Sequence, residues 1–175
     1  MLLHFAQVAL LALGTLGASP AQPLDSALSA PQDDTRAGIE HYNLSKKKLA
    51  LDGYDPVAYF PEHGGKATKG LESITATHQG ITYRFATEAN KAAFLKSPAS
   101  FEPQYGGWCA WAMSDGKGDK VAIDPQSFTV EDGKLYLFYD GLFGDTRKSW
   151  TKAGGAPKLA TKATENWNRY LTPKK

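Results

Sequence analysis

The sequence predicts a small α+β domain in which antiparallel hairpins pack with short helices and a C-terminal amphipathic helix. Two hairpin patterns and one stretch of helical spacing support this fold class. The chain has 175 residues, 42% hydrophobic and 22% charged. This composition excludes a disordered chain, and the length suffices for one hydrophobic core.

The N-terminal segment indicates an exported protein. An apolar run over residues 2–16 precedes small residues, with Ser19 and Ala21 at the positions that a signal peptidase requires. The run is shorter than the roughly 20 apolar residues of a membrane span. We therefore expect a signal peptide over residues 1–21, a flexible linker over residues 22–41, and a secreted or periplasmic mature protein without a membrane span.

The folded domain is expected over residues 42–171. A short strand ends at Leu51 and turns at Asp52–Gly53. The following segment, Asp55–Phe60, is expected to form a tight bend or a single helical turn. Its first residue can cap the turn, and the proline that follows fits the first helical position.

The first hairpin is expected to join residues 72–77 to residues 81–86 through His78-Gln79-Gly80. A helix follows, because Thr87 is a favourable cap and Pro98 prevents continuation of the helix. Alternation with period two places three apolar residues of the second strand on one face: Ile81, Tyr83 and Phe85.

The second hairpin is expected to join residues 128–130 to residues 135–139. Asp132-Gly133 at its centre favours a type I′ turn, and Glu131 then faces Lys134 across the turn. Near the end of the chain, helical spacing predicts a closing helix that packs its apolar face on the domain: Leu159, Ala163, Trp167 and Tyr170.

The charge balance argues against a nucleic-acid partner. The net charge is only +2, and the run Lys46-Lys47-Lys48 is typical of a solvated surface stretch. The sequence names no other partner.

Cys109 is the only cysteine of the chain and the main candidate for chemistry. In an oxidising compartment a single cysteine has no intramolecular disulfide partner. It is then a reactive thiol, a metal ligand, a link to another molecule or a buried side chain. Two glycines before it and two flanking tryptophans indicate a crowded environment.

As a catalytic residue, Cys109 would need activation by another group. A free thiol has a pKa near 8.5, and the first turn of a helix contributes about 0.3–1 kcal/mol, which lowers that pKa by less than one unit. Arg84 and His78 are the candidate activating groups. Turnover would also require an external thiol, since the chain has no second cysteine.

As a metal ligand, Cys109 would act with Met113, because residues four apart share a helix face and both sulfurs suit Cu(I). A histidine would complete the copper site, with His41, His63 or His78 available and His78 taken as the expected ligand. The absence of a Cys-x-x-Cys motif argues against a structural zinc site.

Three segments together resemble the YHS-domain family, and in particular its exported subgroup of (seleno)proteins. They are Leu51–Phe60, Gly80–Phe85 and Pro103–Ala110. The segment from Asp132 to Trp167 is also similar to that subgroup, so the resemblance extends over nearly the whole expected domain. In this subgroup selenocysteine can occupy the position of Cys109, which implies a reactive group there.

The resemblance does not imply the multi-thiolate site of the metal-associated YHS domains. At the positions where those members carry cysteines, this chain has Ala58, Ala86 and Asn90. The subgroup brings no established activity with it. We therefore expect an exported YHS-like domain with Cys109 as a thiol-redox or copper centre. The alternative is a non-catalytic binding module in which Cys109 is a buried core residue.

Overall fold

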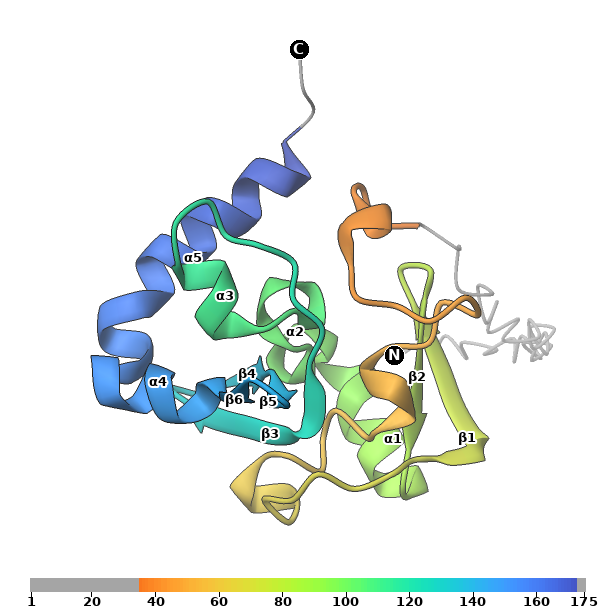
Figure 1. The fold of residues 1–175 in the computed structure, drawn as a ribbon. Helices are drawn as coiled ribbons and strands as arrows, with labels where there is room; N and C mark the ends of the chain where they lie inside the picture. The colour runs from red at the N-terminus through yellow and green to blue at the C-terminus, as the bar shows by residue number, and fades with distance from the viewer. Residues whose placement is uncertain (1–34, 173–175) are drawn as a thin grey trace, which may run out of the picture. The chain divides into compact units, whose positions relative to one another are not determined.

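The structure, a computed structural model, describes residues 35–172. The expected signal peptide, residues 1–21, and residues 22–34 of the expected linker lie outside the described residues. Within residues 35–172 the chain forms three small antiparallel hairpins and five α-helices, so the predicted α+β fold class is confirmed (Figure 1).

Residues 35–41, which the sequence assigns to the linker, are folded onto the domain. The Arg36 guanidinium pairs with Glu102, and the backbone N–H of Arg36 donates to the Gln79 carbonyl at 3.2 Å. The 3₁₀ helix η1 (Ile39–His41) follows, and Ile39 packs on the core. The sequence does not predict that this segment is folded, because the segment has no hydrophobic periodicity. Its partners, Gln79 and Glu102, also lie far away along the chain.

The expected strand ending at Leu51 is reduced to isolated bridges, Leu44–Ala50 and Leu49–Thr82. A 3₁₀ turn, η2 (Leu51–Gly53), follows, and the chain turns there as predicted. Asp55 then caps the next bend, since its Oδ1 accepts the Val57 N–H at 2.8 Å. Another 3₁₀ turn, η3 (Pro61–His63), follows this bend.

The first predicted hairpin is confirmed and continues into two helices. Strands β1 (Leu71–His78) and β2 (Ile81–Phe85) pair antiparallel, with the three predicted apolar residues of β2 buried. Helix α1 (Glu88–Lys96) begins where the Thr87 side chain accepts the Asn90 N–H at 3.0 Å. Helix α2 (Pro98–Phe101) follows at the predicted proline.

The second predicted hairpin is also confirmed. Strands β3 (Asp124–Glu131) and β4 (Lys134–Phe138) pair with Glu131 opposite Lys134. Both turn residues have left-handed backbone, with φ of 50° at Asp132 and 68° at Gly133, as a type I′ turn requires.

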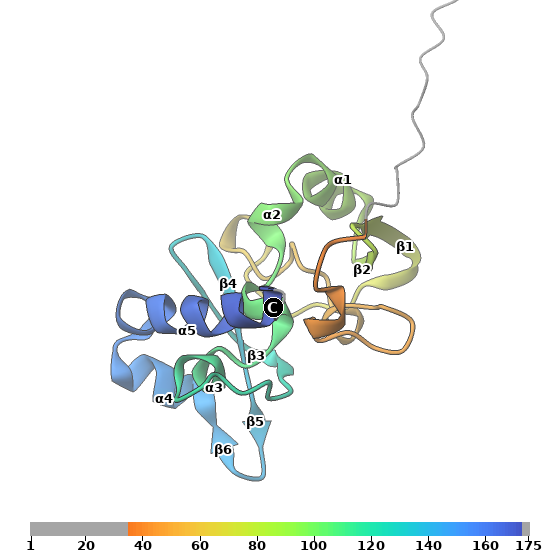
Figure 2. The ribbon, with the colours of Figure 1, turned by 90° about the horizontal axis from the view of Figure 1, so that it is seen from above.

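The remaining elements lie beside this hairpin (Figures 1 and 2). The predicted closing helix is α5 (Gly155–Leu171), which buries Ala163 and Trp167. The sequence did not predict the other elements: the 3₁₀ turn η4 (Gln104–Gly107), α3 (Ala110–Ser114), the hairpin β5 (Asp140–Gly141) and β6 (Gly144–Asp145), and α4 (Thr146–Ala153).

Strand β4 divides the core of the domain into two clusters. Leu135 and Leu137 join the first cluster, which contains the inner face of β2 and Phe94 of α1. The alternate residues Tyr136 and Phe138 join the second cluster, which α3, α4 and α5 complete. Successive side chains of a strand point to opposite faces, so β4 is buried on both sides.

Candidate functional site

Cys109 lies at the N-cap position of α3, beside strand β4, and is completely buried. Its backbone bridges to Leu137, and its N–H donates to the Val121 carbonyl at 3.0 Å. The preceding turn needs glycine, because Gly106 has a φ of 61° and an added Cβ would lie 2.6 Å from the Trp167 ring. The ring that approaches this backbone is that of Trp167 and not of either flanking tryptophan.

Two groups make hydrogen bonds with the Cys109 sulfur. The backbone N–H of Tyr139 donates to Sγ at 3.4 Å, and the Thr146 hydroxyl lies 3.3 Å from Sγ. The same hydroxyl donates to the Tyr139 carbonyl at 2.9 Å. Because its proton is used there, the neutral thiol donates its own proton to Thr146 Oγ1. The thiol is therefore satisfied as a donor and as an acceptor.

A cavity of about 270 Å³ lies over this site. Cys109 belongs to its wall but has no exposed surface, so the sulfur is covered from the cavity side. The other lining residues come from α3, the loop after it, and the two ends of the β5–β6 hairpin: Trp111, Ala112, Asp115, Gly116, Lys117, Asp119, Val121, Tyr139 and Thr146.

The structure brings together only part of the expected metal set. Met113 lies in the same buried cluster as Cys109. His78 lies in β1 instead. Its ring is 6.2 Å from the ring of Phe94, which belongs to the first cluster. In residues 35–172, no group of three or more His, Cys, Asp or Glu side chains is arranged to hold a metal ion.

The expected activating groups also have other partners. Arg84 makes an ion pair of 2.8 Å with Glu72 in the first hairpin. The groups that do reach the sulfur, Thr146 and the Tyr139 N–H, were missed by the sequence analysis. They lie 37 and 30 residues beyond Cys109, and a backbone donor has no sequence signature.

The three positions that the sequence analysis compares with the cysteines of metal-associated YHS domains lie around one carboxylate. Asp55 accepts hydrogen bonds from the backbone N–H groups of Ala58 and Ala86, at 3.3 and 2.8 Å. The Asn90 side chain donates to the same carboxylate at 2.7 Å. A hydrogen-bonded carboxylate therefore takes the place that a thiolate cluster would need.

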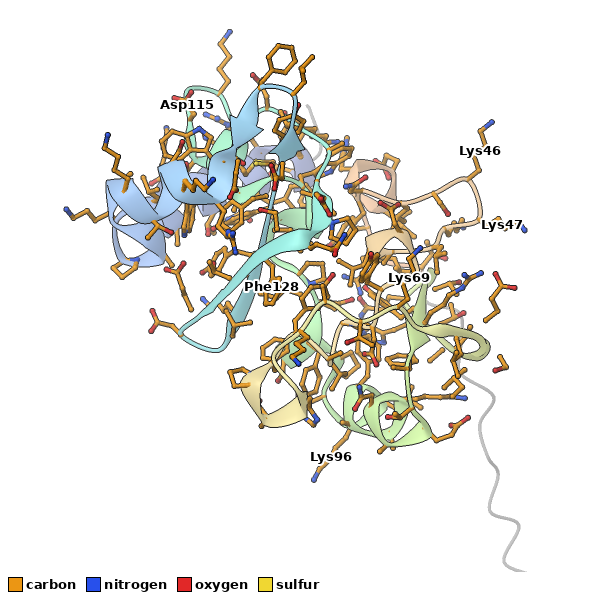
Figure 3. All side chains as sticks on the ribbon, turned by 60° about the horizontal axis from the view of Figure 1, so that its bottom comes forward. Lys46, Lys47, Lys69, Lys96, Asp115 and Phe128 are labelled. Atoms are coloured by element: carbon orange, nitrogen blue, oxygen red, sulfur yellow. The ribbon has the colours of Figure 1, made fainter. Side chains whose placement is uncertain are left out.

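The lysine run lies on the surface, as the sequence predicted. Lys46 and Lys47 are exposed and extend away from the domain (Figure 3).

Comparison of the chain with family models, with curated proteins and with solved structures finds no match. In the part of the chain that the structure describes, none of the helices combines the length and apolar character needed to cross a membrane.

Proposed function

We propose that this chain is an exported YHS-like domain whose functional centre is the Cys109 thiol, acting as a redox nucleophile toward small oxidants. The observation that carries the proposal is the pair of hydrogen bonds at the sulfur, under the wall of a cavity. We favour the thiol over a copper site because the His78 ring packs near Phe94 of the other core cluster.

Thr146 gives the site a means to hold a thiolate. When Cys109 loses its proton, the Thr146 hydroxyl turns from the Tyr139 carbonyl and donates to the sulfur. The thiolate then accepts two hydrogen bonds, from Thr146 and from the Tyr139 N–H. The sulfur is thus held by two hydrogen-bond donors in this arrangement.

The reaction that suits this thiol is oxidation by a peroxide. The thiolate attacks one peroxide oxygen, the O–O bond breaks, and the leaving oxygen takes a proton from water, which leaves a sulfenic acid on Cys109. An external thiol then attacks the sulfenic sulfur and releases water, forming a mixed disulfide. A second external thiol attacks this mixed disulfide, so that Cys109 is released and the two external thiols form a disulfide. Both thiols are external because the chain has no second cysteine to resolve the intermediate.

Access to the sulfur requires a local movement. Tyr139 immediately precedes β5, and Thr146 immediately follows β6. A displacement of this short hairpin uncovers the sulfur to the cavity without unfolding the core. Short hairpins with few buried residues open at lower free energy than the core around them.

The test is the reactivity of Cys109 in the folded protein. We expect iodoacetamide to modify Cys109 at a rate that does not change with low urea concentrations, since local opening exposes little surface. Hydrogen peroxide should produce a sulfenic acid that dimedone traps, read by mass spectrometry. Thr146→Val should slow both reactions by roughly 10-fold, the effect of one lost hydrogen bond to a charged group.

Thr151→Val is the matched control, because the Thr151 hydroxyl bonds only within α4 and is remote from the sulfur; it should react like the wild type. A thiol that reacts only as fast as the protein unfolds contradicts the proposal and supports a binding module with Cys109 as a core residue. Stoichiometric copper in protein purified from its own compartment, lost in Cys109→Ser, would instead support the metal site.

A further inference from the structure

A second cavity has no role in the proposed thiol chemistry. It has a volume of about 710 Å³, within the range of 300–1,000 Å³ that is usual for small-molecule sites. It lies between the N-terminal segment of the domain, the loop after α3 and the end of α5. Its lining is Ala37, Gly38, Glu40, His41, Lys117, Lys120, Asn166, Arg169, Tyr170, Leu171 and Thr172.

Three cations line this cavity: Lys117, Lys120 and Arg169. None of them forms an ion pair with a carboxylate of residues 35–172. Glu40 is the one carboxylate of the lining, and it lies 3.5 Å from the His41 Nε2. The lining therefore carries more cationic side chains than carboxylates.

Lys120 is held in place by His41 and Tyr170. Its Nζ lies 2.9 Å from His41 Nδ1 and 4.5 Å from the centre of the Tyr170 ring. His41 is fixed in turn, because the Trp108 indole donates to its carbonyl at 2.6 Å. Partial burial lowers the pKa of Lys120, with Glu40 opposing the shift. An anion in the cavity would relieve this desolvation cost.

Arg169, also in the lining, is positioned by its own hydrogen bonds. One terminal nitrogen, Nη2, donates to the Lys117 carbonyl at 2.8 Å and to the Asn166 side chain. Asn166 is itself fully buried and bonded to the Met113 carbonyl at 2.8 Å. The other guanidinium nitrogens have no bond to residues 35–172. A guanidinium with N–H groups to spare suits a carboxylate or phosphate.

We infer that this cavity binds a small organic anion, a carboxylate or a phosphate carried on a flat apolar body. Lys120 and Arg169 would bind the anionic group, and Lys117 would add to the attraction. The Tyr170 ring and Leu171 supply an apolar wall for the body of the ligand. The inference does not depend on the thiol chemistry proposed for Cys109, whose cavity shares only Lys117 with the lining of this one.

The experiment titrates the whole mature protein with four probes of similar shape: benzoate, phenyl phosphate, benzamide and benzyl alcohol. Binding is measured by calorimetry and by amide NMR shifts. We expect one or both anions to bind, with shifts at residues of the cavity, and the neutral probes to bind at least about 10-fold more weakly. Benzoate and phenyl phosphate together distinguish a carboxylate site from a phosphate site. Binding should weaken with salt.

Lys120→Met and Arg169→Gln should each weaken anion binding by roughly 10- to 100-fold. Lys96→Met is the matched control, because Lys96 is an exposed lysine at the end of α1 that points into solvent away from the domain (Figure 3), and it should bind like the wild type. If Lys120→Met does not fold, Lys117→Gln, at an exposed position, tests whether the positive charge of the lining contributes to anion binding. Equal binding of anionic and neutral probes, or binding of none at millimolar concentration, would overturn the inference.

Discussion

The carboxylate of Asp55 is fully buried and accepts four hydrogen bonds. Oδ1 takes the N–H groups of Val57 and Ala58, and Oδ2 takes the Ala86 N–H and the Asn90 side chain. The first two bonds shape the bend after β-bridge residue Tyr54. The other two connect this bend to the start of α1. One side chain therefore links three segments around the first core cluster.

Replacing this carboxylate should be among the most destabilising single changes in the domain. Asp55→Ala leaves four N–H donors without their acceptor, two of them buried and two half-buried, so we expect a loss of about 3–5 kcal/mol in the free energy of unfolding. Urea unfolding followed by circular dichroism measures it. Asp115→Ala, at an exposed position of the loop after α3, should change stability by less than about 0.5 kcal/mol. Equal effects of the two substitutions would show that the Asp55 bonds contribute no net stability.

For single residues, the sequence predicts hydrogen bonds between neighbours along the chain and misses those between residues far apart in the chain. The cap formed by Asp55 could be predicted because an aspartate followed by proline favours a turn. Its bonds to Ala86 and Asn90 span 31 and 35 positions and depend on how β2 and α1 return to the bend. The same holds for Cys109, which the sequence identified, and for Thr146, which it did not.

Among the elements, the second hairpin and the C-terminal helices are joined by Glu131. Its Oε1 accepts the Trp150 indole N–H at 2.9 Å, and its Oε2 accepts the Ala156 N–H at 2.7 Å in the first turn of α5. Gly154 offers no side chain to cap this helix. The carboxylate therefore provides the cap from another element, and a negative charge at this end also matches the helix dipole.

Loss of this cap should loosen the attachment of α4 and α5 to the hairpin. For Glu131→Ala we expect a loss of about 2–4 kcal/mol in unfolding free energy, since a buried indole N–H and a helix N–H lose their acceptor. Hydrogen exchange should speed up in the first turn of α5 more than in β2. Glu165→Ala is the control, because Glu165 is exposed and pairs weakly with Lys162. Uniform exchange in α5 and β2 would contradict this role.

Elements with strong local signals were predicted correctly, and elements set by tertiary contacts were not. The Asp132-Gly133 turn has the backbone that its residue types favour. Helix α3 has only five residues and follows a left-handed Tyr105, so it shows no period of its own. Helix α4 is mostly polar and buries only Trp150, and β5 and β6 have two residues each.

In the domain as a whole, four of the eight tyrosines are buried, and burial raises the pKa of each: Tyr59, Tyr83, Tyr105 and Tyr136. Three of these hydroxyls also connect separate parts of the chain. Tyr59 donates to the Pro125 carbonyl at 2.9 Å, Tyr83 to Glu102 at 2.7 Å, and Tyr105 to the Ala160 carbonyl at 3.4 Å.

These raised pKa values predict that the fold loses stability in alkali. Below about pH 10, the usual tyrosine pKa, the four hydroxyls are protonated in the folded and the unfolded chain, and they add no pH dependence. Above it the unfolded chain releases protons that the folded chain retains. The unfolded state then binds fewer protons, so the free energy of unfolding falls as pH rises, by up to about 1.4 kcal/mol per pH unit for each group.

Absorbance at 295 nm, which follows tyrosinate, tests this prediction alongside circular dichroism between pH 9 and 13. We expect these four tyrosines to ionise only when the dichroism of the fold is lost, in one cooperative step. Lysines also titrate in this range, so Tyr59→Phe serves as the comparison: it should remove one tyrosine from the cooperative step and make the fall in stability shallower. Ionisation of all four near pH 10 with native dichroism intact would show that solvent reaches these hydroxyls. The burial of aromatic side chains on both faces of β4 would then not exclude water from the core.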